Sequence, residues 1–286
     1  MTMSKEKSSA IHSILWCRIC EKSFALPSGV CGCGKALPVR NGKINFLPEG
    51  TALKELQEDW LNRVKHLVKE RYAFLYPKLI ALLSPVYGPD PVPKFLSGFS
   101  DTQVILNLGS GTSDFTSENV VNADMAAYDN VDVVMDLTSS PFRPGSVDGI
   151  INIAVLEYVP DPQKIVAVFL SLLKPGGRIL VFVPFMQGFH ASPHDYQRYT
   201  HEGLKILFKE FSNIKIVAEG PTSSLLWILQ EWLAMVLSLG NVRLYRLLSV
   251  ALWILSPLKY LDIFMRNHPC AENIASGFFV FAEKKN

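Results

Sequence analysis

The sequence predicts an α/β fold built around a mostly parallel sheet, and three observations support that prediction. From residue 104 onward, apolar runs of strand length alternate with stretches of helical spacing. Two of the early strand-like runs end at an aspartate, and another ends at a glycine turn. The chain has 286 residues, is 49% hydrophobic and carries a formal net charge of only +2, which suits a sizeable core. Strands that alternate with helices are typical of a parallel sheet with helices packed on its faces.

The predicted elements follow one another in a regular order. We expect strands at 104–108, 119–124, 131–136, 147–154, 178–184, 214–220 and 275–284. We expect helices at 161–173 and 200–211. The run Lys174-Pro175-Gly176-Gly177 should end the first helix. Thr200 should cap the second helix, with Glu202 in its first turn.

The composition divides the chain into three regions. Residues 1–50 should form a small cysteine-containing module, with a hairpin at Asn41-Gly42. Residues 51–97 combine apolar residues at helical spacing with four closely spaced prolines, which predicts a helical cap and a linker. Residues 98–286 should form the main domain, with an apolar helical insertion at 222–268 ahead of the last strand.

The composition also excludes several classes of protein. The high apolar content excludes a disordered chain, and the low net charge lacks the basic excess of many nucleic-acid binders. The first ten residues are polar and charged, so they lack the apolar stretch of a secretory signal. We therefore expect a cytoplasmic protein without disulfides.

A glycine loop follows the first strand of the main domain. Gly109-Ser110-Gly111 comes directly after Leu108, and glycine allows backbone with positive φ while removing the Cβ that would keep a ligand away. The dinucleotide fingerprint needs a third glycine at position 114, where this chain has Asp114. A nicotinamide-type pyrophosphate site is therefore disfavoured. A tight turn without any ligand is the alternative.

Four further motifs accompany the loop. Asp124 closes the second strand, Asp136-Leu137 closes the third, "LEYVPDP" follows the fourth, and "LKPGG" precedes the fifth. Together with "NLGSG" they resemble the motifs of class I S-adenosylmethionine-dependent methyltransferases, over about 100–220 and again at 274–284. The resemblance implies a Rossmann-like, seven-stranded sheet and S-adenosylmethionine as the cofactor.

The resemblance also implies a set of cofactor-binding residues. The glycine loop would lie against the methionine part and the ribose, Asp124 would bind the ribose hydroxyls, and Asp136-Leu137 would lie beside the adenine. Glu157 would either point into this pocket or hold a local helix end. The implied set is Asn107, Gly109, Ser110, Gly111, Asp124, Met125, Asp136, Leu137, Ala154 and Glu157.

Two features depart from the family pattern. Only twelve residues separate Gly111 from Asp124, so the first helix should be very short or missing. Asn107 replaces the acidic residue that the family has two places before the first glycine. Its amide can form a hydrogen bond, but it offers no charge to the ammonium group of the cofactor.

Candidate acceptor-side residues follow the fifth strand, in "PFMQGFHASPHDYQRYT". The stretch resembles an H-x-S-P-x-D-Y-x-R-Y-T pattern found in a subset of bacterial methyltransferases of this class. In this fold the carboxyl ends of the strands face the ligand crevice. A base is needed only where the acceptor must lose a proton. The candidate catalytic residues are His190, His194, Asp195 and Tyr199. The alternative for Asp195 is an ion pair with Arg198 that fixes the loop.

Four clustered cysteines near the start predict a metal site. Their spacing is C-x2-C, ten residues, then C-x-C, at Cys17, Cys20, Cys31 and Cys33. Two close pairs of thiolates suit a tetrahedral structural zinc ion. The following "GCGKALPVRNGKINFLP" resembles the zinc ribbon of certain ribosomal RNA guanine methyltransferases and small zinc-binding activators of methyltransferases. Reduced thiols in a metal-free ribbon and redox chemistry are the alternatives.

The apolar insertion contains two runs of about fifteen residues, at 225–239 and 244–258. A helix that crosses a bilayer needs about twenty. Glu231, Arg243 and Arg246 interrupt or flank the runs, so we expect a helical hairpin and not two spans. It could form a lid, a dimer surface, or a membrane-interface element that uses its tryptophans, which are Trp227, Trp232 and Trp253.

These features predict a methyltransferase that acts on a small or lipid-linked metabolite, such as a glycan intermediate. The expected contacts are that acceptor, the inner face of a membrane through 225–258, and a second copy of the chain. Two alternatives stay open: an rRNA or tRNA methyltransferase whose ribbon binds RNA, and a non-catalytic cofactor-binding partner of another enzyme. The first is suggested by a modest basic set at Arg18, Lys22, Lys35, Arg40 and Lys43.

Overall fold

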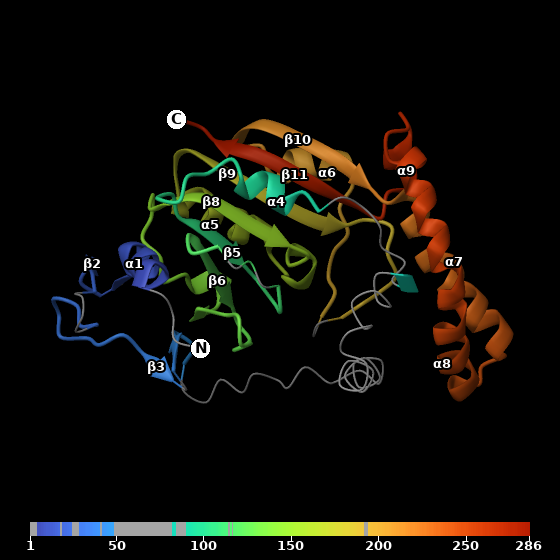
Figure 1. The fold of residues 1–286 in the computed structure, drawn as a ribbon, viewed down its shortest axis with the longest axis horizontal. Helices are drawn as coiled ribbons and strands as arrows, with labels where there is room; N and C mark the ends of the chain where they lie inside the picture. Colours follow the sequence, from blue (N-terminus) through green and yellow to red (C-terminus); the bar gives the residue numbers. More distant parts are fainter. Residues whose placement is uncertain are drawn as a thin grey trace.

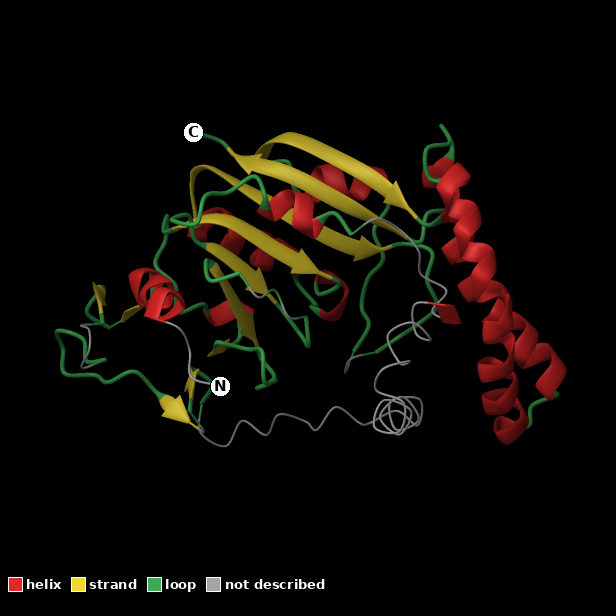
Figure 2. Ribbon diagram, in the orientation of Figure 1, coloured by secondary structure: helices red, strands yellow, loops and turns green. Residues whose placement is uncertain are grey.

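The computed structural model describes residues 5–17, 19–24, 29–40, 42–48, 82–83, 90–113, 115, 117–191 and 194–286. Figure 1 shows the arrangement of the elements, and Figure 2 shows the same view with helices and strands in different colours. In chain order the described elements are α1 (Lys5–Ile14), β1 (Trp16–Cys17), β2 (Lys22–Ser23), β3 (Val39–Arg40), β4 (Lys43–Asn45), α4 (Val92–Leu96), β5 (Ile105–Leu108), β6 (Val120–Asp124), β7 (Val133–Val134), η1 (Leu137–Ser139), β8 (Val147–Ile153), η2 (Leu156–Tyr158), α5 (Pro162–Leu172), β9 (Leu173–Pro184), α6 (His201–Leu207), β10 (Phe211–Glu219), α7 (Pro221–Ser238), α8 (Val242–Ala251), η3 (Leu252–Leu261), α9 (Asp262–Met265), η4 (Ala271–Ile274) and β11 (Gly277–Lys284).

The central sheet is mostly parallel, which confirms the predicted fold class. Its strand order is β10-β11-β9-β8-β5-β6-β7-β4-β3. The strands from β4 to β9 pair in parallel, whereas β11 is antiparallel to both of its neighbours and β3 is antiparallel to β4. The expected number of seven strands was wrong, because the sheet has nine strands in the described part of the chain. The two additional strands, β3 and β4, come from the N-terminal region.

The N-terminal region shares the core of the main domain. β3 and β4 pair antiparallel, as the predicted hairpin requires, with Arg40 opposite Lys43. β4 then continues the sheet through the parallel pairing of Ile44 with Val133. Ile11 and Ile14 of α1 are buried in the same hydrophobic cluster as the sheet. The described part of residues 1–50 is thus packed onto the main domain and extends its sheet.

Helices cover the two faces of the sheet because its residues alternate between them. Leu106 and Ile150 face the larger cluster, which takes in α1, α5 and α6. Ile105 and Ile151 face the smaller cluster, which takes in α4 through Val92 and Phe95. The four sheet residues just named are fully buried. The carboxyl ends of β8 and β9 point toward the helical insertion (Figure 1).

Local signals explain where most elements begin and end. Asp161 caps α5 by accepting a hydrogen bond from the backbone N–H of Lys164, and Thr200 caps α6 through Gly203. The 174–177 run was expected to end the first helix, and α5 ends just before it, at Leu172. The run itself lies inside β9, at a shift in the pairing with β8. α6 ends at Leu207 instead of continuing to 211, because β10 begins at Phe211.

The helical insertion stands at the carboxyl-end side of the sheet (Figure 1). α7 and the continuous helical stretch Val242–Met265 form the predicted hairpin between β10 and β11. Val242–Met265 has 24 residues, and among the described residues it is the one helix long and apolar enough to cross a membrane. The cap expected over 51–97 lies outside the described residues, except for 82–83 and 90–97.

Candidate functional site

The glycine loop sits at the carboxyl end of β5 and needs its glycines. Gly109 has φ +74° and Gly111 has φ +53°, in the left-handed region that favours glycine. A Cβ on Gly109 would stand 2.4 Å from Cγ2 of Val155, so that position has no room for a side chain. No described atom lies within 4 Å of the corresponding point on Gly111. The loop therefore packs on one side against the segment after β8 and leaves its other side open.

Asp124, at the carboxyl end of β6, fixes the conformation of this loop. Its Oδ2 accepts a hydrogen bond of 2.7 Å from the backbone N–H of Gly111, and its Oδ1 accepts one of 2.8 Å from Ala126. A carboxylate has about four acceptor positions, so lone pairs stay available for ligand hydroxyls. Met125 follows it and is 48% exposed. The predicted ribose-binding carboxylate is thus in contact with the predicted loop.

The structure bears on two expectations about the loop, the missing first helix and the role of Asn107. None of the described residues between β5 and β6 is helical, as the short spacing predicted. Asn107 is buried, and its Nδ2 donates a 2.9 Å hydrogen bond to Oδ1 of Asn122 on the adjacent strand. The structure therefore places its amide in contact with the neighbouring strand, and binding of a ligand by Asn107 stays a prediction.

The other predicted cofactor residues lie at the same edge of the sheet. Asp136 begins η1 by accepting hydrogen bonds from the N–H and hydroxyl of Thr138. Leu137 lies in η1 and is half-buried. Ala154 follows β8 with φ +53°, an uncommon conformation for a residue with a Cβ. This strained residue turns the chain from β8 into η2, which carries Glu157.

Glu157 is a buried carboxylate without a hydrogen-bond partner among the described residues. It is 0% exposed, and neither of its oxygens has a partner. Burial raises the pKa of this carboxyl to about 7, and the nearby Asp195 adds to the shift while Arg198 opposes it. Ser110 Oγ and Asn152 Oδ1 are also buried without a partner. Unpaired buried polar atoms are rare, so these oxygens are candidate contacts for a polar ligand.

His190 lies beside Glu157. The distance from its Nε2 to Oε1 of Glu157 is 4.0 Å. Its Nδ1 lies 2.9 Å from the carbonyl oxygen of Gly188, which can only accept a hydrogen bond. Nη2 of Arg198, which can only donate, lies 3.2 Å from the same Nδ1, so an acceptor and a donor compete for this nitrogen. Nε2 is the ring nitrogen that faces Glu157. The ring also contacts Tyr158 and Trp227, with centroid distances of 5.8 Å and 5.7 Å.

Asp195 and Arg198 hold the loop that carries His190. Arg198 donates to both oxygens of Asp195 and to the carbonyl of Gly188. The backbone N–H of His190 donates a 2.9 Å hydrogen bond to Oδ2 of Asp195. The guanidinium holds the pKa of Asp195 below its ordinary value. The alternative predicted for this pair, an ion pair that fixes the loop, is the arrangement observed.

The structure gives the other two predicted catalytic residues different surroundings. His194 is exposed and contacts the ring of Tyr196 at 5.5 Å. Tyr199 is buried, and its hydroxyl donates a 3.3 Å hydrogen bond to the carbonyl of Leu156. Burial raises the pKa of Tyr199. Its hydroxyl therefore supports the segment next to Glu157, and a catalytic role for either residue stays a prediction.

Sequence reasoning missed two ring contacts of the site. Trp227 was assigned to the insertion, although it also packs against Gly188 and the ring of His190. Tyr158 was treated as part of a motif without a role of its own. Burial raises its pKa to about 12, so it stays protonated at neutral pH. Trp227 follows the glycine loop by more than a hundred residues, and no local signal connects the two.

Comparison with known proteins gives one match to a family model. Residues 106–181 match the model described as a methyltransferase domain. The matched methyltransferase domain runs from β5 into β9 and contains all the predicted cofactor residues. The His190–Tyr199 loop and the helical insertion lie beyond it. No curated protein matches the chain.

Several solved structures are similar to the chain at low identity. Phosphoethanolamine N-methyltransferase 2 of Haemonchus contortus is 16% identical with a TM-score of 0.44, and the match covers 68% of this chain and 52% of that one. An S-adenosylmethionine-dependent methyltransferase of Archaeoglobus fulgidus is 13% identical with a TM-score of 0.44, over 79% of this chain and 100% of that one. The [4+2]-cyclase SpnF is 14% identical with a TM-score of 0.42, over 76% and 95%. The chain thus spans about half the length of the first of these proteins.

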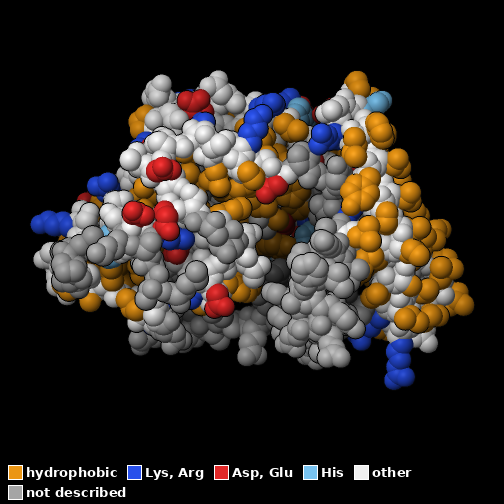
Figure 3. All heavy atoms as spheres, viewed as in Figure 1, with side chains coloured by type: hydrophobic (Ala, Val, Ile, Leu, Met, Phe, Trp, Pro, Cys, Tyr) orange, Lys and Arg blue, Asp and Glu red, His pale blue; other side chains and the backbone are white. Residues whose placement is uncertain are grey.

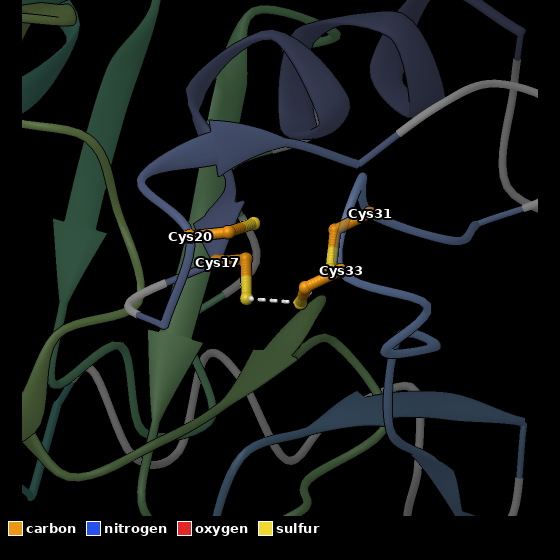
Figure 4. Close-up of side chains that lie close together, drawn as sticks. All are labelled: Cys17, Cys20, Cys31 and Cys33. Atoms are coloured by element: carbon orange, nitrogen blue, oxygen red, sulfur yellow. Dashed lines mark hydrogen bonds between the residues drawn. The ribbon is translucent and has the colours of Figure 1, made fainter.

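The four clustered cysteines precede the segment that matches the methyltransferase model, residues 106–181. Figure 4 shows their thiols pointing toward one another. All four Sγ atoms lie within 4.8 Å of one another, with 3.7 Å between Cys17 and Cys33 and 2.9 Å between Cys31 and Cys33. Zinc–sulfur bonds of about 2.3 Å in a tetrahedron place the sulfurs about 3.8 Å apart. The donor set and its spacing therefore fit a structural zinc ion after small adjustments.

The thiols also compete for protons. Hydrogen bonds from the backbone N–H groups of Cys20 and Ile19 lower the pKa of Cys17 to about 6. The neighbouring Cys31 raises the pKa of Cys33 to about 12. One thiol is thus stabilised as thiolate while its neighbour keeps its proton. A bound cation would relieve this conflict, because metal-bound thiols are deprotonated.

Proposed function

We propose that the chain is an S-adenosylmethionine-dependent methyltransferase. The observation that carries the proposal is the placement of the glycine loop and Asp124 in contact, at the carboxyl ends of adjacent parallel strands, within the segment that matches a methyltransferase domain. Ligands of open α/β sheets bind at this edge. Asp136 and Glu157 follow the next strands at the same edge.

The residues present fit the cofactor. The open side of Gly111 would lie against the methionine part and ribose, with Asp124 on the ribose hydroxyls and Asp136-Leu137 beside the adenine. The unpartnered Ser110 Oγ offers a further polar contact. When bound, S-adenosylmethionine supplies a methyl group that is already activated for transfer. Much of the rate enhancement by the protein would then come from orienting the acceptor.

The Glu157–His190 pair gives the site a group that can take up a proton. At neutral pH the carboxyl is divided between its two protonation states, since its pKa is about 7. Nε2 of His190 faces it, and Asp195 and Arg198 keep the imidazole in place. The pair suits an acceptor hydroxyl or amine that must lose a proton during transfer. Within this proposal Glu157 and His190 are the catalytic residues, and Asp195 and Arg198 are positioning residues.

Calorimetry on the full chain tests the shared premise. We expect S-adenosylmethionine and S-adenosylhomocysteine to bind, and Asp124→Asn to weaken both at least about tenfold, because hydrogen bonds to a charged group are lost. Asp101→Asn, an exposed aspartate near the opposite end of β5, is the matched control. Absence of binding by the unaltered chain would overturn the proposal.

The acceptor class is proposed from the surroundings of the site. The helix that carries Trp227 is largely apolar, which favours a small or lipid-linked metabolite. Formation of S-adenosylhomocysteine with fractionated cell extract would identify the acceptor. Binding of the cofactor without turnover in any fraction would favour the alternative of a non-catalytic partner that activates another enzyme.

Methylation of RNA is the second enzyme alternative. It rests on the basic residues of the ribbon, among which Lys22 and Lys35 are exposed. Lys43 is engaged, because its Nζ donates to the carbonyl oxygens of Tyr128, Asp129 and Val131. This engagement reduces the basic surface available to RNA. Tight binding of RNA that falls steeply with salt would favour this alternative.

We further propose that Cys17, Cys20, Cys31 and Cys33 hold a structural zinc ion. Four convergent thiols supply a complete tetrahedral set of ligands, which suits a structural site better than a catalytic one. The ion would hold β1 and β2 against the loop that carries Cys31 and Cys33. It would contribute folding free energy to a region with few buried residues of its own.

A further inference from the structure

The helical insertion has its polar side chains inside and its large apolar side chains outside. Apart from Pro221 and Leu226, the buried side chains of α7 are small or polar, at Ser223, Ser224, Gln230, Ala234 and Ser238. Those of η3 and α9 are Ser256, Lys259 and Asp262, and α8 has none. The exposed side chains include Leu225, Trp232, Met235, Leu239, Leu247, Ile254, Leu258 and Phe264. A surface helix of a water-soluble protein normally has the opposite pattern.

Hydrogen bonds hold this inverted hairpin together. The carboxylate of Asp262 accepts from the backbone N–H groups of Thr222 and Ser223, at 2.7 Å and 3.1 Å. Nε2 of Gln230 donates to the carbonyl of Leu252 and to the hydroxyl of Ser256, at 3.1 Å and 3.2 Å. Small residues and hydrogen bonds between helices are typical of helix pairs in a lipid environment. The hairpin is therefore cohesive while its outer face stays apolar.

The charges of the insertion have one sign on its outer face. Between 232 and 270 the sequence contains a single acidic residue, Asp262, and it is only 1% exposed. Arg243 and Arg246 are exposed near the α7–α8 turn. Figure 3 shows hydrophobic side chains over the outer side of the insertion, with basic side chains near one end. Trp232 and Tyr260 are 53% and 41% exposed, and such side chains are enriched at membrane interfaces.

We propose that the outer face of α7–α9 docks on the surface of an anionic lipid bilayer. Apolar side chains with exposed arginines, and no exposed acid between 232 and 270, complement a lipid interface with negative headgroups. A second copy of the chain fits this face less well, because a symmetric contact would bring the exposed arginines of both copies to one interface. Between 232 and 270 the outer face offers no exposed acidic side chain to such an interface.

The hairpin lies along the interface and does not cross the bilayer. Val242–Met265 is long enough to cross, but its hydrogen bonds tie it to α7 through Gln230 and Ser223. α7 would have to enter the hydrocarbon with it, together with Glu231. The arginines near the α7–α8 turn would then have to pass through the hydrocarbon to the far side, which is costly. An orientation parallel to the surface keeps them at the headgroups.

Docking would place the acceptor side of the site beside the membrane. Trp227 on α7 packs against the ring of His190, and the hydroxyl of Ser224 donates a 2.9 Å hydrogen bond to the carbonyl of Met186. One helix thus carries both the lipid-facing side chains and contacts to the His190 loop. The docking itself does not depend on the proposed methyl transfer.

Flotation of the full chain with vesicles tests the docking without any cofactor. One set of vesicles contains phosphatidylcholine alone, and the other contains phosphatidylcholine mixed with phosphatidylglycerol. We expect binding to the mixed vesicles, and a loss of at least about tenfold in L247D/I254D, since two exposed apolar side chains would no longer be buried. The matched control is I206D, because Ile206 is 69% exposed on α6. R243Q should bind about fivefold more weakly, and K209Q is its control.

The outcomes separate the candidate occupants. Failure of the unaltered chain to float with either vesicle would overturn the proposal, as would equal flotation of the chain and L247D/I254D. Equal binding to both vesicles would overturn the anionic preference. A dimer in light scattering that L247D/I254D converts into a monomer, without flotation, would assign the face to a second copy instead. Cofactor binding by calorimetry is measured separately, so failure of the docking leaves the proposed function intact.

Discussion

At the scale of one residue, the burial of Glu157 lowers stability at neutral pH but gives the proposed site a carboxyl that can take up a proton. Its folded-state pKa of about 7 lies above its ordinary value of 4.5, so the fold favours the protonated form. Below pH 4.5 the carboxyl is protonated in both states and carries no penalty. As the pH rises from 4.5 to 7, the unfolded chain loses its proton first, and the free energy of unfolding falls by about 3 kcal/mol.

We therefore expect Glu157→Gln to stabilise the protein above pH 7 and to have little effect near pH 4. Denaturant titrations at both pH values measure the difference in the free energy of unfolding. Glu210→Gln, at an exposed residue, is the control and should change stability equally at both. A gain that does not depend on pH would contradict the assignment of Glu157 as a buried carboxylate whose pKa is raised by burial.

The same residue predicts how methyl transfer depends on pH. If the ionised carboxylate accepts the proton of the acceptor, kcat/KM should rise as the pH rises through about 7 and then level off. Glu157→Gln should lower the plateau at least about a hundredfold and remove this dependence. Rates measured across this pH range check it. A Glu157→Gln profile that keeps the same midpoint would assign the titration to another group.

Asn107 shows what residue-level reasoning could not reach. Its position in the motif predicted a contact with the cofactor. Its observed partner, Asn122, depends on the register that places these two residues side by side in adjacent strands. The register between strands depends on the whole sheet, so a local motif does not predict it. The Asp195–Arg198 contact was foreseen because it spans only three positions along one loop.

At the scale of elements, the glycine loop depends on the segment after β8. Gly109→Ala would place a Cβ 2.4 Å from Cγ2 of Val155 and would strain a backbone with φ +74°. We expect a loss of about 2 kcal/mol or more in stability, together with weaker binding of S-adenosylmethionine. Gly111→Ala has the same kind of strain without a described neighbour, so it should cost about 1 kcal/mol.

A double variant separates the contact between the new Cβ and Val155 from the backbone strain at residue 109. Val155→Ala removes both Cγ atoms, so Gly109→Ala/Val155→Ala should be more stable than the sum of the two single changes predicts. Denaturant unfolding of the four proteins measures this coupling. Strictly additive effects would show that backbone strain alone accounts for the cost.

The boundaries of elements were predictable where a cap or turn residue decides them. Asp161 and Thr200 mark the starts of α5 and α6 as expected. The end of α6 was misplaced, because 208–211 continues the helical spacing of apolar residues. Phe208 and Phe211 pack together at 5.9 Å, and Phe211 starts the strand that pairs with β11. Pairing of β10 with a distant strand thus overrides the local helical pattern.

At the scale of the whole molecule, the parallel order of the main domain followed from its alternating pattern, whereas the extension to nine strands did not. β3 and β4 have two and three residues, too few to show a period. Their place at the sheet edge depends on a contact between residues 44 and 133. The Cys cluster was foreseen from its spacing, but its connection to the main core through α1 was not.

This connection predicts how loss of metal spreads through the protein. α1 precedes Cys17, and its Ile11 and Ile14 lie in the main hydrophobic cluster, while β4 continues the sheet beyond the cysteines. Loss of the ion should therefore lower the unfolding temperature of the whole chain in one cooperative transition.

Elemental analysis should find about one zinc per chain, and a chelator or Cys20→Ser should remove it. Cys270→Ser, at an exposed cysteine away from the cluster, should keep both the metal and the stability. An early, separate transition with the main transition unchanged would mean that the ribbon folds on its own and only rests against the edge of the sheet.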